Sequence, residues 1–411
     1  MKSSTSDPPD FFANYHYMQP FNHRLVFIAA CFGMLIFGIV MTVLGSVLPS
    51  VIEKFNIDNT EAGTLFVFLS AGLLGGNIIF GPIVDRFGYK PLLIICSALA
   101  AFGFIGIAFS PSMFFLGASF LLSGFAGAAI NGGTNALVSD ISEGKRGSRL
   151  TLLGVFFGIG AFGVPLLLGT LLDKYSYEFL ISTIGLSVIF PLILFAVLRF
   201  PPPKNLRGFP ITEGIDLAKN STLILFGFIL LIQSGLEMSM GGWSATFFSE
   251  VIQVPSHRAV LFLSLFWMGL TMNRIFLSYL LLKFQTPTIM NFSLACSFTG
   301  SIIMLSASTP FMGALGLILT GMGFAAVFPV VLAYVGDLFV HLSGTAFSIV
   351  FVMALMGGMT MPYLIGVISD IYNLRVAMMM IPLAILISVI LFRISDNRSA
   401  QAKGQPAPPA T

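Results

Sequence analysis

Twelve apolar stretches of about 20 residues or more, each long enough to cross a bilayer as a helix, fill most of the sequence. Charged residues make up only 9% of the chain, whereas soluble domains carry about 25%. Since a bilayer core offers no water to backbone groups, such stretches must be helical. The sequence therefore predicts an all-α membrane protein with spans at 25–48, 62–84, 91–109, 113–138, 150–172, 179–199, 222–248, 259–283, 288–307, 311–336, 344–368 and 373–393.

The longest interval between spans divides the twelve helices into six plus six. It covers residues 200–221 and contains three consecutive prolines, Pro201 to Pro203. Both ends of the chain are polar, and we expect them to be loose tails. The predicted organisation is a tail over 1–22, a six-helix bundle over 23–199, a linker over 200–221, a second six-helix bundle over 222–394 and a tail over 395–411.

The two halves repeat each other. At a constant offset of 197 residues, Gly, Asp, Pro and Tyr residues of spans 4 and 5 recur in spans 10 and 11. Two parallel six-helix repeats are typical of transporters that expose a midplane site to each side of the membrane in turn. The matching pairs are Gly124 and Gly321, Asp140 and Asp337, Pro165 and Pro362, Gly169 and Gly366, Asp173 and Asp370, and Tyr175 and Tyr372.

The distribution of basic residues orients the spans. If both termini are cytoplasmic, 15 of the 20 Lys and Arg residues lie inside and four outside, while Arg274 lies within a span. Lys and Arg concentrate in cytoplasmic loops of membrane proteins. We therefore expect both termini, both tails and the linker on the cytoplasmic side of the plasma membrane, which in bacteria is the inner membrane.

The turn between spans 2 and 3 reads GPIVDRFGYKP, from Gly81 onward. Gly81 is expected to let two helices pack closely, and Gly88 to permit a tight turn. Asp85 can accept hydrogen bonds at a helix N-terminus or from a basic side chain. Arg86 and Lys90 are expected to hold the turn on the cytoplasmic side.

This turn resembles the signature loop of the major facilitator superfamily. The resemblance implies alternating access, and a gating role for the loop as a latch that breaks when the cavity opens inward. Four further segments are similar to the fucose–glucose proton symporter family, which implies sugar import driven by a proton gradient. The usual span 4 carboxylate of that family is Asn131 here, and an Asp that some members carry in span 1 is Gly45. The four segments are 158–168, 234–239, 264–275 and 321–334.

Polar residues deep in the spans are candidate substrate ligands. Glu237 is the acidic residue farthest inside a span, and Gln233 lies one turn earlier on the same face. A charge at that depth is expected to face a protein interior or a watery cavity. Asn131 and Asn135 form a second pair on one face of span 4. Such a set suits a sugar, because each sugar hydroxyl both donates and accepts.

The remaining candidates allow more than one role. Trp243 and Trp267 are predicted to stack on the apolar face of a sugar ring, with ordinary packing as the alternative. Thr42 and Ser46 in span 1 are further candidates, although hydroxyls and amides also join membrane helices to one another. Arg274 is assigned a structural or gating role, with ligand contact as the alternative, since counting helical rise places it at a different depth from Glu237.

Together these features predict a secondary transporter of a sugar or related polar molecule, coupled to a cation, with the proton as the first expectation and sodium as the other ion. Glu237 is the candidate coupling residue. No phosphate-binding GxxxxGK[ST] loop and no HExxH or GxSxG motif is present, so we expect no enzyme. We expect no cofactor, metal or nucleic acid, a monomer, and partners limited to substrate, ion and lipid bilayer. The alternatives are an exporter of amphipathic compounds, a sugar uniporter and a receptor or sensor that has lost transport.

Overall fold

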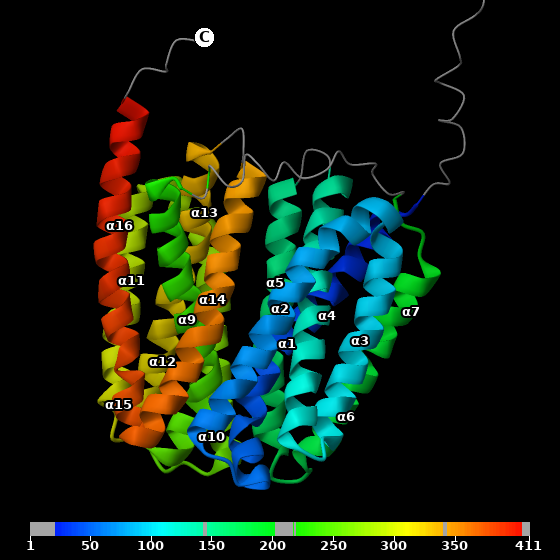
Figure 1. The fold of residues 1–411 in the computed structure, drawn as a ribbon, viewed down its shortest axis with the longest axis vertical. Helices are drawn as coiled ribbons and strands as arrows, with labels where there is room; N and C mark the ends of the chain where they lie inside the picture. The colour runs from blue at the N-terminus through cyan, green and yellow to red at the C-terminus, as the bar shows by residue number, and fades with distance from the viewer. Residues whose placement is uncertain (1–20, 143–145, 202–216, 218, 340–342, 405–411) are drawn as a thin grey trace, which may run out of the picture.

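The protein is a bundle of long helices that run roughly parallel to one another (Figure 1). The computed structural model describes residues 21–142, 146–201, 217, 219–339 and 343–404; most of the predicted N-terminal tail and linker lie outside these ranges. Within them, twelve spans are long and apolar enough to cross a membrane, as the sequence predicted. The helices are α1 (His23–Phe55), α2 (Asn59–Phe87), α3 (Tyr89–Phe109), α4 (Met113–Ile141), α5 (Arg146–Leu171), α6 (Tyr177–Ser187), α7 (Ile189–Val197), α9 (Ser221–Glu250), α10 (Ser256–Lys283), α11 (Thr286–Leu305), α12 (Pro310–Phe324), α13 (Val327–Leu338), α14 (Ser343–Ile371), α15 (Leu374–Met378) and α16 (Met380–Gly404).

Three spans consist of two helices each, and a proline accounts for each break. Proline cannot donate a backbone hydrogen bond, and its ring clashes with the carbonyl four residues earlier. Pro191 follows the break between α6 and α7, Pro329 the break between α12 and α13, and Pro382 the break between α15 and α16. Each break falls at or next to the residue four positions before the proline, the one whose carbonyl receives no backbone hydrogen bond from it.

The two halves repeat in their packing as well as in their sequence. A Cβ atom added to Gly72 on α2 would collide with the Leu121 carbonyl of α4. One added to Gly269 on α10 would lie 2.6 Å from the Ile318 carbonyl oxygen of α12. These two contacts are related by the same offset of 197 residues that relates spans 4 and 5 to spans 10 and 11. The sequence repeat therefore extends to the second helix of each half and fixes how closely that helix packs on the fourth.

Replacing a glycine at this kind of contact is expected to destabilise the fold. A Cβ on Gly321 would collide with the Phe266 carbonyl, so the Gly321→Ala variant must shift one backbone against another. Overpacking of this kind costs about 1–3 kcal/mol. Thermal unfolding of the detergent-solubilised protein measures the loss.

Gly81→Ala is the matched control for that measurement. No described atom lies within 4 Å of a Cβ added to Gly81, so the expectation that Gly81 packs closely against another helix is wrong in this conformation. We expect the control to unfold near the wild-type temperature. Equal losses in the two variants would show that helix propensity, and not the close backbone contact, sets the cost.

The two halves meet at the side of the membrane opposite the first and last described residues, which we call the far side. α2 packs on α14, α5 on α10, and α1 on α9. In Figure 1, α2 and α14 converge where α2 begins and α14 ends, and they diverge toward the side of the termini, which we call the terminal side. A Cβ on Gly45 of α1 would collide with the Gly241 carbonyl of α9, so these two backbones touch directly.

Asp370, near the end of α14, closes the far side most directly. Its carboxylate accepts hydrogen bonds from the backbone N–H groups of Asn59, at 3.1 Å, and Thr60, at 2.6 Å. These are free N–H groups in the first turn of α2, where a negative charge is also favoured by the helix dipole. The side-chain amide of Asn59 donates to the Ser369 hydroxyl at 3.0 Å. Residues more than 300 positions apart are thereby joined across the two halves.

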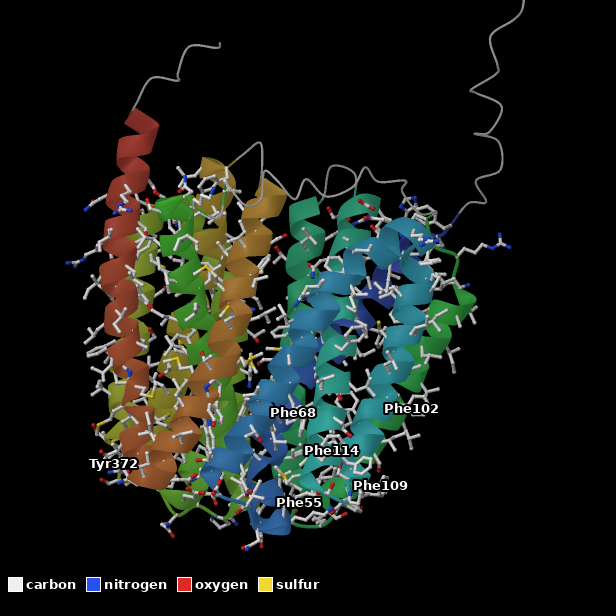
Figure 2. The ribbon with its side chains drawn as sticks, viewed as in Figure 1. Phe55, Phe68, Phe102, Phe109, Phe114 and Tyr372 are labelled. Carbon is white, nitrogen blue, oxygen red and sulfur yellow. The ribbon has the colours of Figure 1, made fainter. Side chains whose placement is uncertain are left out.

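Large apolar side chains cover the outside of the bundle. Figure 2 labels Phe102, Phe109, Phe114 and Tyr372, which are 67%, 65%, 72% and 70% exposed in the isolated chain. A soluble protein rarely leaves so much apolar surface uncovered. This surface fits contact with lipid tails rather than with water.

The C-terminal segment departs from its prediction. α16 continues to Gly404, so residues 395–404 of the predicted tail are helical. Asp396 accepts a hydrogen bond from the Tyr334 hydroxyl at 2.5 Å, and the Arg398 guanidinium donates to Ser221 at 3.1 Å. These contacts hold the polar end of the helix against α13 and α9, and its polar composition alone does not reveal them.

Candidate functional site

Three predicted residues meet on α9 and α10. The side-chain amide of Gln233 donates to Glu237 Oε1 at 2.9 Å, and the Arg274 guanidinium lies 3.8 Å from the same oxygen. The Arg274 side chain is 36% exposed and that of Glu237 14%, so the cation is the more accessible partner. The arrangement holds one carboxylate between an amide and a guanidinium inside the membrane-spanning region.

The ion pair corrects the predicted difference in depth between Glu237 and Arg274. Backbone rise along an upright helix leaves out the tilt of the helix and the length of the side chain. An arginine side chain is long, and α9 and α10 pack directly against each other. A cation and an anion within a membrane span are each costly alone, and pairing offsets part of that cost.

Gln233 also binds the break between α12 and α13. Its Nε2 donates, at 3.3 Å, to the carbonyl oxygen of Phe324, the last residue of α12. Phe324 ends α12, so its carbonyl is one of the groups that a helix end leaves without an intrahelical donor, and the amide satisfies it. The broken span therefore contributes backbone to this cluster, a contribution that sequence analysis did not predict. Pro329 was the available signal.

The amides of α4 form a separate pair in the other half. Asn135 Nδ2 donates to both the backbone and the side-chain oxygen of Asn131 at 2.9 Å and lies 3.8 Å from the Met34 sulfur. Both asparagines are half-buried. In the described residues, no hydrogen bond joins this pair to Gln233, Glu237 or Arg274. The structure thus brings together the predicted residues of each half, but it does not join the two groups.

The two tryptophans do not offer a face to a ligand in this conformation. Trp243 is fully buried, and its indole N–H donates to the Pro362 carbonyl of α14 at 2.9 Å. Its ring lies 5.9 Å from that of Phe66, on α2 of the other half. Trp267 is 1% exposed and packs edge-on against Phe157 and Phe266. The predicted stacking on a sugar ring therefore stays a prediction for a more open conformation.

The two hydroxyl residues of α1 have local partners. Thr42 donates to the Gly38 and Ile39 carbonyls, and Ser46 donates to the Thr42 carbonyl at 2.8 Å. Both side chains are buried. Back-bonding of this kind satisfies a hydroxyl within its own helix, so neither residue needs a ligand to complete its hydrogen bonds.

The turn between α2 and α3 lies on the terminal side. Gly88 has φ 82°, a conformation that favours glycine, so the predicted need for glycine in a tight turn is confirmed. Arg86 lies over the Phe87 ring at 5.3 Å and is exposed. Tyr89 stands where the signature pattern has a basic residue, and its hydroxyl donates to Asp140 at 2.6 Å. The turn is thus tied to α4 by a neutral donor. The gating roles of Asp85, Arg86 and Lys90 stay predictions.

Comparison with protein families assigns the architecture. The family model described as Major Facilitator Superfamily matches residues 30–339 and 287–410. The chain belongs to the Major Facilitator Superfamily. Membership of the superfamily agrees with the twelve spans, and proteins of this superfamily are membrane transporters and not enzymes.

Curated relatives within the superfamily are distant. "Uncharacterized MFS-type transporter YfkL" of Bacillus subtilis (strain 168) is 24% identical over 81% of this chain and 86% of its own length. "Glucose/mannose transporter GlcP" of the same organism is 21% identical over 80% of this chain and 84% of its own length. Both alignments span most of each protein, so the similarity covers the transporter fold as a whole.

Solved structures confirm the fold. A mutant form of the nucleoside transporter NupG superposes with a TM-score of 0.77 at 15% identity, and the match covers 91% of this chain and 99% of that one. A bacterial homolog of the human lysosomal transporter Spinster, in an inward-facing and unoccupied conformation, gives 0.76 at 13% identity, covering 94% and 99%. At these identities the likeness establishes the major facilitator fold alone.

Proposed function

We propose that this protein moves a sugar or a related polyhydroxylated molecule across the plasma membrane by alternating access, coupled to a cation, in the first place a proton. The observation that carries the proposal is the polar cluster of α9 and α10, in which Glu237 is held by Gln233 and Arg274. Asn131 and Asn135 add amides from the other half. Amides and a carboxylate suit sugar hydroxyls, each of which donates and accepts.

Two relatives support the substrate class by their names. The sequence relative GlcP is described as a glucose/mannose transporter. The structural neighbour NupG is described as a nucleoside transporter, and a nucleoside contains a sugar. The resemblance to the fucose–glucose proton symporter family points the same way. These likenesses support a sugar or nucleoside and do not choose between them, so the substrate is proposed as a class.

Coupling and orientation are part of the proposal. Glu237 is the proposed coupling residue, because it is a carboxylate inside a membrane span and its partner Arg274 lies on a neighbouring helix. The excess of Lys and Arg supports a cytoplasmic location for the terminal side. On this orientation, the turn with Asp85, Arg86 and Lys90 is the proposed inner gate. Arg274 is proposed to bind Glu237 rather than substrate in the empty carrier.

The alternatives separate in one experiment. Purified protein in liposomes is tested for uptake of labelled glucose, fucose, uridine and an amphipathic cation, with and without a pH gradient or a sodium gradient. We expect sugar uptake that a pH gradient drives uphill. Uptake of the cation alone would favour an exporter of amphipathic compounds, and downhill sugar uptake insensitive to both gradients would favour a uniporter. Binding without any transport would favour a receptor.

The asparagine pair provides a test of the site itself. Asn131→Ala and Asn135→Ala are each expected to weaken sugar binding by about 1–3 kcal/mol, because ligand hydroxyls would lose their partners. Binding is measured by the rise in unfolding temperature with added sugar, since a ligand of the folded state stabilises it. Variants that bind normally but unfold at lower temperature would show that the two amides only join α4 to its neighbours.

A further inference from the structure

Two buried donors on α10 lack hydrogen-bond partners within the described part of the chain. They are the Trp267 indole N–H and the Thr271 hydroxyl, and neither atom has measurable solvent access. Because a buried polar group without a partner costs free energy, such groups are uncommon and call for an explanation. The two residues are one helical turn apart and therefore share a face.

The Thr271 hydroxyl, like those of Thr246 and of four buried serines, has no partner among the described residues, whereas other buried threonines are bonded within their helices. Thr42, Thr134 and Thr320 each donate to a carbonyl three or four residues earlier in their own helix. This bond is available to almost any threonine within a helix. Thr271 does not make it, so its hydroxyl has an orientation that leaves it ready for a partner outside α10.

Both donors lie at the contact between the two halves. A Cβ on Gly158 of α5 would collide with the Thr271 side chain, and its distance to Thr271 Oγ1 would be 2.7 Å. Trp267 packs on Phe157 of α5, with ring centroids 6.2 Å apart, and against Gly241 of α9. These residues lie near the middle of α5 and α10, and the same two helices also touch nearer their far ends, where Gly169 faces Leu261. When the halves separate there, Thr271 loses its neighbour Gly158 and the Trp267 ring loses Phe157, while Gly241 of the same half stays beside the indole.

The same face of α10 leads to the proposed site. Arg274 lies seven residues after Trp267 and three after Thr271, which places all three side chains on one face of the helix. Arg274 reaches Glu237 from this face. Along this face of α10, the indole N–H of Trp267 comes first, the hydroxyl of Thr271 second and the guanidinium of Arg274 third. Arg274 belongs to the charged cluster with Glu237.

We propose that Trp267 Nε1 and Thr271 Oγ1 bind oxygen atoms of a polyhydroxylated substrate when the contact between α5 and α10 is open. This inference rests on the proposed function and extends its site to Thr271 and to the polar edge, not the ring face, of Trp267. In the empty protein with its far side closed, the two donors are buried without partners, which raises the free energy of that state. Substrate that accepts hydrogen bonds from both donors would stabilise the state with the far side open. A ligand shifts a conformational equilibrium only through such differential contacts.

Thr271→Val tests the inference, because valine keeps the shape of threonine and removes the hydroxyl. Unfolding temperature is measured without ligand and with D-glucose, D-mannose or uridine. We expect no loss of stability without ligand, since an unpartnered buried hydroxyl is removed. We expect about ten-fold weaker binding of whichever compound binds the wild type. Thr320→Val is the matched control; it removes a hydroxyl that is already bonded within α12, and it should leave the binding constant unchanged.

A second readout uses the tryptophan itself. The chain has two tryptophans, so a Trp243→Phe background leaves Trp267 as the sole indole emitter. Bound sugar should change its emission, and Thr271→Val should move the midpoint of that change to about ten-fold higher concentration. Trp267→Phe should weaken binding similarly in the stability measurement.

Three results would overturn the inference. The first is a compound that binds wild type and Thr271→Val equally, which leaves the proposed function intact. The second is a Thr271→Val variant that is less stable without ligand, which shows that the hydroxyl has a structural partner. The third is a wild type that binds none of the three compounds, which removes the proposed substrate class and the inference together.

Discussion

Glu237→Gln is expected to abolish uphill accumulation of substrate while leaving exchange of labelled for unlabelled substrate intact. Glutamine resembles a permanently protonated Glu237, so the loaded carrier can still exchange but cannot release a proton and reset. The two rates are measured in the same liposomes, with a pH gradient for accumulation and without one for exchange. The expected loss of accumulation is complete, whereas exchange should stay near the wild-type rate.

The ion pair of Glu237 and Arg274 provides matched controls. Glu237→Ala leaves Arg274 without its counter-charge in the membrane and should lower the unfolding temperature, by less than the loss of a fully buried pair because Arg274 is 36% exposed. The double variant Glu237→Ala/Arg274→Ala removes both charges and should recover much of that loss. If accumulation depends on external sodium and Glu237→Gln abolishes that dependence, sodium is the coupling ion. If wild-type uptake responds neither to a pH gradient nor to a sodium gradient, Glu237 has no coupling role.

Asp370→Asn is expected to open the far side of the protein. The Asp370 carboxylate accepts from two backbone N–H groups of α2, and hydrogen bonds to charged groups contribute about 1.5–3 kcal/mol. Losing the charge should favour the far-open state by about ten-fold or more. Spin labels on Glu61 and Tyr372, both exposed near the far ends of α2 and α14, report the separation of the halves. The label sites require a background without the three native cysteines.

Asp173 is the matched control for Asp370. It occupies the equivalent position in the sequence repeat, and it is exposed. In the described residues, no hydrogen bond or ion pair links Asp173 to the other half. Asp173→Asn should therefore leave the distance distribution unchanged. A distribution that Asp370→Asn also leaves unchanged would mean that the backbone contact of Gly45 with Gly241 keeps the far side closed without help from the carboxylate.

The sequence predicted the fold because hydropathy and the repeat each act through many residues. Twelve apolar spans follow from backbone hydrogen bonding in lipid, and no single residue decides them. The repeat offset of 197 residues, found in spans 4, 5, 10 and 11, also describes the contacts of Gly72 with Leu121 and of Gly269 with Ile318. The end of α16 was missed, because its helix is held by side-chain contacts of Asp396 and Arg398 with other spans.

The candidate site was predicted less completely, because helical spacing gives the face of a residue but not its neighbour. The i, i+4 rule correctly paired Gln233 with Glu237 and Asn131 with Asn135. It has no information on contacts between helices, so it missed the ion pair with Arg274 and the burial of Trp243 against α14. Asp370 was visible as a repeat position, but its bond to α2 depends on how the two halves meet.

The placement of both intramembrane charges in one half has an electrical consequence. Glu237 and Arg274 lie on neighbouring helices and move together, so their charges cancel when the empty carrier changes conformation. In the proposed proton-coupled cycle, protonation of Glu237 would leave the Arg274 charge uncompensated, and carrying one charge across the full membrane potential involves about 2.3 kcal/mol per 100 mV. Membrane voltage should therefore act on the proton-loaded carrier, while the empty carrier returns at a rate that voltage does not change.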